Sequence, residues 1–432
     1  MLYQEARVIV FATIFAKNYL AHVRTLMDSV ARHHPEARRV ALLVDRPDGC
    51  FDPAREDFEI VASDELPISN RPGFFFQYTV LEAATALKPL FLSHLLARAG
   101  VERLIYLDPD MQLFQPLDPV MRALDSCYWA LTPHLTLPAG PKTERHILQS
   151  GAYNLGFLAL RPGALAERLL AWWTERIRDS CFAEPQDGLF VDQRWMDLAP
   201  TLFSPVAILR DAGCNVAYWN LPQRPIKKQG TTYNVAQEPL RFFHFSGFRP
   251  DRPEIVSSHA PEMQTCKVGD AGELLSHYGQ RLRAAGWENA SAWPYSFGTF
   301  DTGQPIMDFG RRITRLDAGF VAIVNPFSAE GQERFGRFWT SALRKGGPSM
   351  LAWTIYRHRP DLQRRFPLVP GEDCVALASW LRTFGQNEYR IPPDLLGDTP
   401  LLGLVPHRMG GGTLSAVLDR LRLLANNLKR KG

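Results

Sequence analysis

The sequence lacks the features of a membrane-spanning or nucleic-acid-binding protein. It has no apolar run of the ~18 residues that a membrane span needs. Its net charge of +4 is small for 432 residues, and no interleaving of basic and aromatic residues points to nucleic acid as a partner. A hydrophobic fraction of 46% with 22% charged residues is typical of a folded globular chain and excludes a disordered one.

Metal-binding cysteine motifs, repeats and low-complexity segments are also absent. No two of the six cysteines form a CxxC pair, so the sequence contains no zinc-binding pattern. Glu5 precedes the first apolar run and no basic segment comes before it, so we expect a first strand there rather than a signal peptide. Scattered cysteines without a signal peptide are typical of reduced thiols, and we therefore expect a cytoplasmic protein.

Short apolar runs alternate with helical patterns over the first part of the chain. We expect strands at 7–15, 39–46, 57–66, 103–110, 153–163 and 241–250, and helices at 18–35, 77–98, 164–182 and 187–200. Pro89 should kink the second of these helices, and Pro200 should end the last one. The alternation predicts an α/β fold with a mostly parallel sheet flanked by helices, in which ligands bind at the carboxyl ends of the strands.

The texture of the sequence changes near residue 265. Beyond it, helical segments alternate with loops rich in glycine, proline and aromatic residues, so we expect two domains, 1–265 and 266–432, the second mainly helical. Over residues 414–431, leucines and a valine share one helical face beside several arginines and lysines. A basic amphipathic helix of this kind can lie on an anionic membrane, whereas packing on its own domain is the alternative.

Two aspartates follow an apolar run in the stretch VERLIYLDPDMQLFQPLDP, residues 101–119. Asp108 and Asp110 come directly after the run that ends at Leu107. Carboxylate oxygens suit Mg²⁺ or Mn²⁺, which keep coordination positions for phosphate oxygens. Asp and Pro are also common in solvated turns, but the buried run favours a crevice at a strand end. We therefore predict a divalent-cation site that holds a diphosphate.

Several motifs together resemble one enzyme family. The segment LIYLDPDM is similar to the metal-binding signature of GT-A glycosyltransferases, particularly the family 8-like nucleotide-sugar transferases. Further motifs occur in the family's order within residues 7–250: FATIFAKNYLAHVRTLMDSV, ALKPLFLSHLL, YNLGFLAL, DGLFVDQRWMD and FFHFSGF. The resemblance implies a Rossmann-like GT-A catalytic domain over 1–265, and an acceptor or membrane-surface role for 266–432.

The resemblance also implies a metal and diphosphate site. Asp108 and Asp110 would bind Mn²⁺ or Mg²⁺, and His244 would complete the protein ligands. A lone histidine is more often structural. Lys88 would contact the diphosphate, and Gly247 would let the backbone approach a phosphate closely.

Residues just past the first strand would hold the base and ribose of the donor. In the resembling family this loop cradles both, and here it contains Thr13, Lys17, Asn18 and Tyr19. An ordinary N-cap turn is the alternative for Thr13 and Asn18. Asp45, at the end of the second strand, would also meet the base or ribose.

Four residues would surround the donor sugar. Asn154 and Gly156 would line its pocket, and strand-end packing is the alternative for both. In the family the glutamine of an Asp-Gln pair lies near the anomeric carbon, which implies retention of configuration. Glutamine is a poor nucleophile, so we expect Gln193 to stabilise an oxocarbenium-like state and Asp192 to bind a sugar hydroxyl.

The sequence departs from the family at one phosphate contact. The family has a His-x-x-Gly-x-x-Lys pattern, and in this sequence Pro250 stands where the pattern has its lysine. Arg249, one residue earlier, would supply the phosphate contact instead. This difference and the long spacer between Asp110 and Asn154 indicate a separate, bacterial-type branch. Residues 208–221, rich in asparagine and aromatic residues, would line the acceptor side or pack in the core.

The sequence therefore predicts a metal-dependent, hexosyltransferase-like glycosyltransferase. Its donor would be a nucleoside diphosphate sugar, with UDP favoured, and its acceptor a glycan or lipid-linked glycan, as in polysaccharide or lipopolysaccharide synthesis at the inner face of the membrane. A nucleotidyltransferase is an alternative, although FATIFAKNYL lacks the glycine-rich loop that it would usually need. A carbohydrate-binding or nucleotide-binding protein that has lost catalysis is another.

Overall fold

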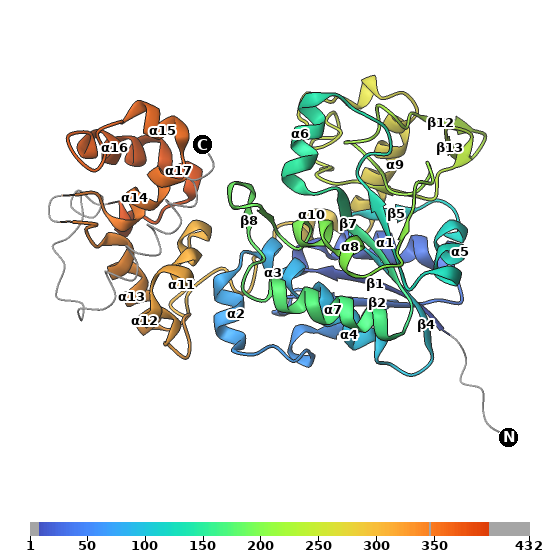
Figure 1. Cartoon of the computed structure of the whole chain (residues 1–432), viewed down its shortest axis with the longest axis horizontal. Coiled ribbons are helices and arrows are strands. Elements are labelled where there is room, and N and C mark those ends of the chain that lie inside the picture. The colour runs from blue at the N-terminus through green and yellow to red at the C-terminus, as the bar shows by residue number, and fades with distance from the viewer. Residues whose placement is uncertain (1–7, 345–346, 397–432) are drawn as a thin grey trace. The chain divides into compact units, whose positions relative to one another are not determined.

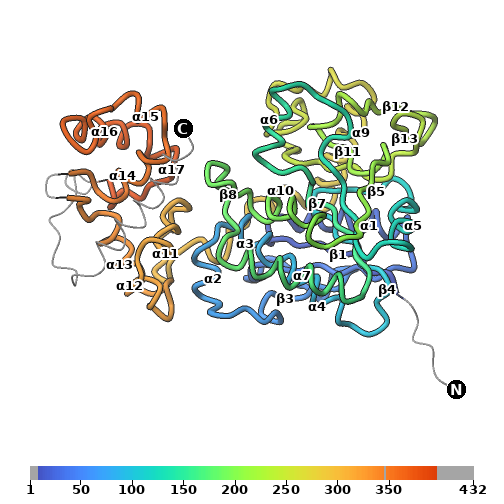
Figure 2. The backbone as a smooth tube through the Cα atoms, viewed as in Figure 1, coloured from blue at the N-terminus to red at the C-terminus, as the bar shows by residue number. Residues whose placement is uncertain are grey.

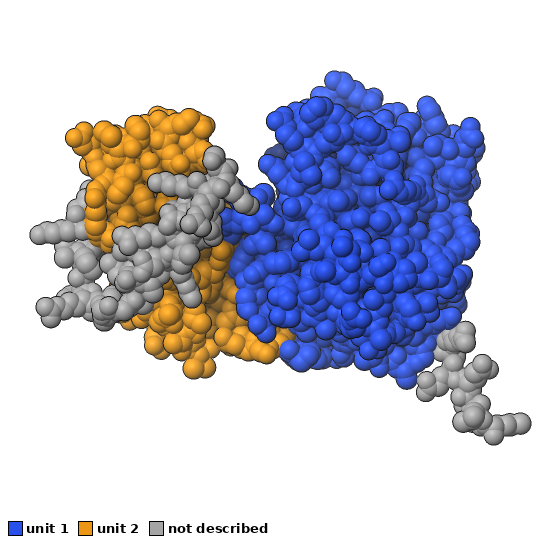
Figure 3. Space-filling model, viewed as in Figure 1, with its two compact units in different colours: residues 1–67, 80–296 blue, residues 68–79, 297–432 orange. Residues whose placement is uncertain are grey.

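The computed structural model describes residues 8–344 and 347–396. These fall into two compact units, coloured separately in Figure 3. Unit 1 comprises the chain up to Pro67 together with Val80–Ser296, and unit 2 comprises Ile68–Thr79 together with the chain from Phe297 onward. The predicted amphipathic segment 414–431 lies outside the described residues. Among the described residues, no helix is both long enough and apolar enough to cross a bilayer.

Unit 1 is built on a seven-stranded sheet with the strand order β10-β6-β7-β4-β1-β2-β3. Strands β7, β4, β1 and β2 of this sheet are labelled in Figure 1. Its strands are β1 (Val8–Phe15), β2 (Arg38–Leu43), β3 (Glu59–Ala62), β4 (Val101–Leu107), β6 (Trp129–Pro133), β7 (Tyr153–Leu160) and β10 (Ala207–Ile208). Strands β1 to β4 run parallel, as do β6 and β10, whereas β7 is antiparallel to both of its neighbours. The expected mostly parallel α/β sheet is therefore confirmed.

Helices cover both faces of this sheet, which explains why its central strands are mostly apolar. On one face, α1 (Leu20–His33) and α5 (Asp118–Ser126) pack with Phe11, Ile105 and Phe157. Successive side chains of a strand point to opposite faces. Tyr106, next to Ile105, accordingly lies under Lys88 of α4 (Lys88–Leu96), which packs against β4 and against α7 (Ala164–Ile177).

Two expected helices differ from the structure. The segment predicted as one kinked helix, 77–98, contains α3 (Val80–Ala86) and α4, and α2 (Arg71–Gln77) ends where it begins. Pro89 lies in the first turn of α4, where a missing N–H costs nothing, so it starts a helix instead of kinking one. The prediction of a helix at 187–200 is wrong.

Residues 183–202 form short pieces instead of that helix. Strands β8 (Ala183–Glu184) and β9 (Leu189–Phe190) pair as a hairpin, and Gly188 takes a positive φ of 75° in the turn. A 3₁₀ helix at Arg194–Asp197 and α8 (Ala199–Leu202) follow. Pro200 stands at the start of α8, for the same reason that Pro89 starts α4.

A second, three-stranded sheet brings distant parts of unit 1 together. Strand β15 (Phe242–His244) lies between β11 (Val216–Ala217) and β5 (Met111–Leu113), antiparallel to β5. A further small sheet contains β12 (Ile226–Gln229), β13 (Thr232–Val235) and β14 (Glu238–Pro239). Helix α9 (Ala271–Ala284) packs on this region through a core that includes Leu275, Tyr278 and Phe245. Because α9 buries its apolar face here, unit 1 extends to Ser296 instead of ending near 265.

Unit 2 is mainly helical, as expected for the C-terminal region. The α-helices in its described residues are α2, α11 (Ile313–Leu316), α12 (Ala318–Val321), α13 (Ala329–Thr340), α14 (Met350–Arg357), α15 (Pro360–Arg365), α16 (Cys374–Trp380) and α17 (Gln386–Tyr389). In Figure 2, α2 lies beside α11, although it comes from the connection between β3 and α3. The core of unit 2 therefore includes a segment from the first part of the chain.

Candidate functional site

Asp108 and Asp110 lie in the turn between β4 and β5, at the carboxyl end of a central strand. The Asp108 N–H donates to the carbonyl of Gly156 at 2.7 Å, and the Asp108 carbonyl accepts from the Met111 N–H at 3.1 Å. The carbonyl of Asp110 accepts from the Phe245 N–H at 2.8 Å. Backbone hydrogen bonds to β7 and to the residue after β15 thus hold both carboxylates in place.

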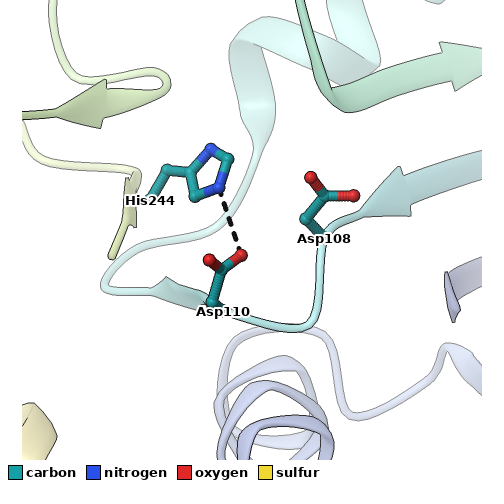
Figure 4. A group of neighbouring side chains, drawn as sticks. All are labelled: Asp108, Asp110 and His244. Carbon is teal, nitrogen blue, oxygen red and sulfur yellow. Dashed lines mark ion pairs between the residues drawn. The ribbon is translucent and has the colours of Figure 1, made fainter. Parts of the chain in front are cut away.

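His244 reaches the same place from β15. The antiparallel pairing of β15 with β5 puts His244 opposite Met111, the residue after Asp110. Its Nε2 atom lies 3.1 Å from Oδ1 of Asp110, and Figure 4 shows the ring directed toward this carboxylate. One ligand atom from each of Asp108, Asp110 and His244 lies within 4.8 Å of the others. The structure therefore brings the three predicted metal ligands together.

This donor set fits a small divalent cation. Two carboxylates suit Mg²⁺ and Mn²⁺, and the imidazole favours a transition metal such as Mn²⁺ over Ca²⁺. Burial raises the pKa of Asp110, but the His244 imidazole more than offsets this, and that pKa lies below its ordinary value. Asp110 is therefore ionised and available as a ligand at neutral pH.

A buried ion pair lies behind Asp108. The Nζ atom of Lys88 is 2.7 Å from Oδ2 of Asp192 and 3.8 Å from Oδ1 of Asp108, and it donates to the Leu155 carbonyl at 2.9 Å. Burial lowers the pKa of Lys88, but Asp192 and Asp108 outweigh burial and raise that pKa above its ordinary value. Lys88 thus stays charged, and it neutralises Asp192 while facing Asp108.

Gln193 and Asn154 connect this region to His244. The Gln193 Oε1 atom accepts from the Leu155 N–H at 3.0 Å, and its Nε2 donates to the Ser150 carbonyl at 2.6 Å. Asn154 Nδ2 lies 3.5 Å from Gln193 Oε1, and Asn154 Oδ1 lies 3.2 Å from His244 Nδ1. The predicted sugar-site residues therefore lie next to the predicted metal ligands.

Gly156 leaves the space that the His244 ring occupies. A Cβ atom at this position would come within 2.7 Å of His244 Cε1 and 2.6 Å of Met111 Cε. Distances below about 3.0 Å force the neighbours to move. A glycine is therefore required here by the approach of His244.

Lys17 and Asp45 form a separate buried cluster. The Lys17 N–H donates to Asp45 Oδ1 at 3.0 Å, and its Nζ is bonded to Asp45, Asp48 and Ser296 at 3.3, 2.7 and 2.8 Å. Lys17 is only 1% exposed. The structure thus places both residues where they tie the loop after β1 to the loop after β2 and to Ser296.

The other predicted donor-binding residues occupy varied positions. The buried Thr13 hydroxyl has no hydrogen-bond partner among the described residues, and Asn18 is half-buried. Tyr19 stacks on His22 with ring centroids 4.5 Å apart. Tyr19 is 41% exposed, but partial burial and the charges of Asp110 and Asp108 raise its pKa to about 12, so its hydroxyl remains protonated.

Gly247 and Arg249 follow β15. Gly247 has a φ of 71°, and a Cβ there would come within 2.7 Å of Ser257 Oγ, so both conformation and space require glycine. Arg249 is exposed and donates to both carboxylate oxygens of Asp251, at 2.9 and 2.7 Å. Its guanidinium therefore lies on the surface, and Asp251 already holds it.

Three residues next to the site, Asn215, Trp219 and His134, were not named individually from the sequence, although the interpretation of 208–221 covered the first two. Asn215 Nδ2 donates to Asn154 Oδ1 at 3.0 Å and to Thr132 Oγ1 at 2.7 Å. The Trp219 ring stands edge-on to the rings of His244 and His134, at 5.2 Å from each. The asparagine- and tryptophan-rich composition of 208–221 was the available signal, and this part of the segment packs around His244.

No family model matches the chain. Two proteins of Bacillus subtilis (strain 168), both described as uncharacterized, are similar in sequence. YfnF is 31% identical over 173 residues, which are 39% of this chain and 57% of YfnF. YfnD is 26% identical over 246 residues, which are 55% of this chain and 77% of YfnD. The chain thus matches little more than half the length of YfnF.

Several solved structures of glycosyltransferases are similar to parts of the chain. The glycosyltransferase GlyE of Streptococcus pneumoniae TIGR4 is 17% identical with a TM-score of 0.37, covering 69% of this chain and 67% of GlyE. The galactosyltransferase LgtC, in complex with donor and acceptor sugar analogues, is 14% identical with a TM-score of 0.37, covering 63% of this chain and 95% of LgtC. These values are low, so the functional inference depends on this chain's own residues.

Proposed function

We propose that the protein is a metal-dependent glycosyltransferase of the GT-A type. It transfers a sugar from a nucleoside diphosphate sugar, with UDP favoured, to a glycan or lipid-linked glycan. The observation that carries this proposal is the convergence of Asp108, Asp110 and His244 at the carboxyl end of β4. The motifs that resemble the family are the same ones that supply these side chains and the residues behind them.

The metal-binding side chains would act on the diphosphate. Bound by Asp108, Asp110 and His244, Mn²⁺ or Mg²⁺ would neutralise the charge that develops on the departing nucleoside diphosphate. Lys88 keeps a second positive charge 3.8 Å from Asp108. Because its Nζ already contacts Asp192 and the Leu155 carbonyl, Lys88 acts through these partners instead of reaching a phosphate freely.

The sugar would lie beside Asn154, Gly156, Asp192 and Gln193. Gln193 Oε1 accepts from the Leu155 N–H and lies 3.5 Å from Asn154 Nδ2, so these contacts fix its amide, whose dipole would stabilise positive charge at the anomeric carbon. Asp192, oriented by Lys88, would accept a hydrogen bond from a sugar hydroxyl. We expect retention of configuration; NMR of the product would identify its anomer, and an inverted product would contradict this part of the proposal.

Residues after β1 and β15 would hold the nucleotide. Thr13, Asn18 and Tyr19 would contact the base and ribose, while Gly247 and Arg249 would approach a phosphate. Lys17 and Asp45 would support this loop from behind, because their polar atoms already bond to each other. Contact of the C-terminal basic segment with a membrane remains a prediction.

Thermal unfolding with nucleotides tests the proposal. The wild type is melted with UDP, GDP or CDP, each with and without Mn²⁺. A nucleotide at ~100 times its dissociation constant should stabilise the protein by about 2.7 kcal/mol. We expect a Mn²⁺-dependent shift with one nucleotide, and UDP is favoured.

Two variants make this experiment specific. Asp110→Ala should lose the Mn²⁺-dependent shift. Asp125→Ala, which removes an exposed carboxylate paired with Arg103, should keep it. The absence of a shift with every nucleotide in a folded wild type would contradict the transferase. A shift without turnover of any sugar donor would favour a nucleotide-binding protein that has lost catalysis.

A further inference from the structure

We infer that Gln193 and Asn154 form an orienting relay that holds the His244 ring with Nε2 toward the two aspartates and a hydrogen on Nδ1. The inference rests on the proposed function, because it assigns a role to residues behind the proposed metal site. It makes Gln193 and Asn154 positioning residues for a metal ligand, in addition to any contact with the sugar. All three side chains are buried, so water does not set their orientation.

The orientation of the Gln193 amide is fixed by two backbone groups. A side-chain amide has an oxygen that only accepts and a nitrogen that only donates, and the two ends are otherwise similar in shape. The Leu155 N–H can only donate, and it lies 3.0 Å from Oε1. The Ser150 carbonyl can only accept, and it lies 2.6 Å from Nε2. Rotating the amide by half a turn would lose both bonds.

Gln193 in turn fixes the amide of Asn154. The Asn154 Nδ2 atom lies 3.5 Å from Gln193 Oε1 and 3.4 Å from His134 Nε2. A reversed Asn154 would put its oxygen against the Gln193 oxygen, so two acceptors would meet in a buried site. Asn215 supports the same orientation by donating to Asn154 Oδ1, but the Thr132 hydroxyl behind it can donate or accept. Gln193 is therefore the member of this group whose partners allow one orientation.

Asn154 then fixes the proton on His244. Its Oδ1 atom lies 3.2 Å from His244 Nδ1, and an oxygen of this kind only accepts, so Nδ1 must carry a hydrogen. Nε2 lies 3.1 Å from Asp110 Oδ1, a hydrogen-bond distance, so without a metal a proton on Nε2 lies between these two atoms. A divalent cation at Asp108, Asp110 and His244 would take the place of that proton, while Nδ1 keeps its own.

The surroundings of His244 hold the ring in the plane that this bond requires. The Trp219 ring packs edge-on against it with an interplanar angle of 87°. Gly156 provides the space on another side, since a Cβ there would come within 2.9 Å of Asn154 Oδ1 as well as contacting the ring. The histidine thus has one orientation, and the relay keeps a hydrogen on Nδ1 in it.

A double-mutant cycle on Mn²⁺ affinity tests the relay. Free Mn²⁺ is measured by electron paramagnetic resonance, without nucleotide, for the wild type, Gln193→Met, Asn154→Asp and the double variant. Gln193→Met lets the Asn154 amide reverse, and we expect a loss of Mn²⁺ affinity of about 10-fold to 100-fold, the range for partners that orient metal ligands. In Asn154→Asp, either orientation of the carboxylate presents an oxygen to His244. There, Gln193→Met should change the affinity by no more than about twofold.

Matched variants separate the relay from other effects. Ser29→Ala removes a buried hydroxyl that accepts from the Leu113 N–H on β5, and it should leave Mn²⁺ affinity within about twofold of the wild type. Thermal melting confirms that each variant is folded. Gln193→Met could reduce Mn²⁺ affinity equally in the wild-type and Asn154→Asp backgrounds. That result would overturn the relay, because Gln193 would then act through its backbone partners at Leu155 and Ser150 and not through Asn154.

A second readout does not depend on metal binding. In protein labelled with ¹⁵N-histidine, the His244 signals are identified by their loss in His244→Gln. Without metal, Nδ1 should carry a hydrogen in the wild type, because Asn154 Oδ1 accepts it. In Gln193→Met, the reversed Asn154 amide would donate to Nδ1, so Nδ1 should lose its hydrogen while Nε2 keeps its bond to Asp110. A wild-type ring without a hydrogen on Nδ1 would overturn the relay. The expected Nδ1 hydrogen without any Mn²⁺ binding would instead contradict the proposed metal site.

Discussion

The two units of the chain bury different kinds of side chain. Unit 1 buries a group of polar residues that are bonded to one another around the candidate site: Lys88, Asp192, Gln193, Asn154, Asn215, His134 and His244. Unit 2 buries a large group of aromatic rings, including Phe75, Phe76, Phe300, Phe320, Phe335, Phe338 and Trp339. Buried polar groups cost free energy unless each has a partner, so a protein retains them where they have a use. The difference supports the proposal that the chemistry takes place in unit 1.

The aromatic core of unit 2 is assembled from two separated segments of the chain. Phe75 of α2 stacks on Phe297 with ring centroids 4.2 Å apart. The buried Arg311 donates to the carbonyls of Phe76 and Phe297, at 3.1 and 2.8 Å. Residues 68–79 are therefore part of the fold of unit 2, and a fragment beginning at Phe297 would lack part of its core.

The largest effect should come from breaking the buried ion pair of unit 1. Lys88→Met would leave Asp192 buried without its cation, and this should lower the free energy of unfolding by about 3–5 kcal/mol. Replacing both partners, in Lys88→Met with Asp192→Leu, should recover most of the loss because no buried charge remains. Denaturant unfolding measures both changes. If Lys88→Met lowered the free energy of unfolding by less than about 1 kcal/mol, the pair would contribute no more than an exposed ion pair, and the prediction would be wrong.

The aromatic core of unit 2 should respond almost as strongly, through packing instead of charge. Phe76 contacts the rings of Phe320 and Phe327 at centroid distances of 4.9 and 5.2 Å. Phe76→Ala should lower the free energy of unfolding of unit 2 by about 3–5 kcal/mol, through lost burial and a remaining cavity. Phe384→Ala is the control: this ring is 57% exposed, and its removal should cost less than about 0.5 kcal/mol. Similar costs for both variants would contradict the core assignment.

Acid should act on unit 1 through two buried histidines. Burial lowers the pKa of His22 and of His134 from 6.5 to about 4, although nearby groups partly oppose it. Above pH 6.5, each histidine is neutral in both the folded and the unfolded protein. Between pH 6.5 and about 4, each histidine binds a proton only in the unfolded protein, so the free energy of unfolding falls as pH falls. At about pH 5 the loss should be about 2 kcal/mol for each histidine.

Unfolding measurements between pH 7.5 and pH 4.5 check this sign and size. His22→Gln removes one of the two groups, so its stability should fall less steeply with acid than that of the wild type. Equal slopes for the variant and the wild type would show that His22 is protonated in the folded state as well.

The sequence predicted the main sheet well, and it also pointed to the group that Asp108, Asp110 and His244 form. The apolar runs that became β1, β4 and β7 are long enough to indicate buried strands, and Asp108 and Asp110 follow one of them. Parallel strands place such ends at one edge of a sheet. The convergence of His244 with these aspartates also depends on the short pairing of β15 with β5, which only the motif order suggested.

Side-chain partners could not be predicted, because they come from distant parts of the chain. Lys17 resembled a donor-binding lysine, but its Nζ is bonded to Asp48 and Ser296, which are 31 and 279 residues away. The helix predicted at 187–200 failed because a turn at Gly188 interrupts it. The boundary near 265 reflected composition, whereas the apolar face of α9 packs on unit 1. Local pattern indicates that a face is buried but does not identify what covers it.

The smallest effect should come from an ion pair of unit 2 that is open to water on one side. Arg334 donates to both oxygens of Asp317, each at 2.7 Å, and the Asp317 side chain is 2% exposed against 32% for Arg334. Asp317 Oδ1 also accepts from the Gly319 N–H at 3.0 Å, at the start of α12. After Arg334→Gln, water can approach from the arginine side while this cap bond remains. The loss should therefore be about 1 kcal/mol or less by denaturant unfolding. Arg334→Gln could instead lower the free energy of unfolding as much as Lys88→Met does. Water access would then not determine the cost of breaking these ion pairs, and the comparison between the two units would fail on this point.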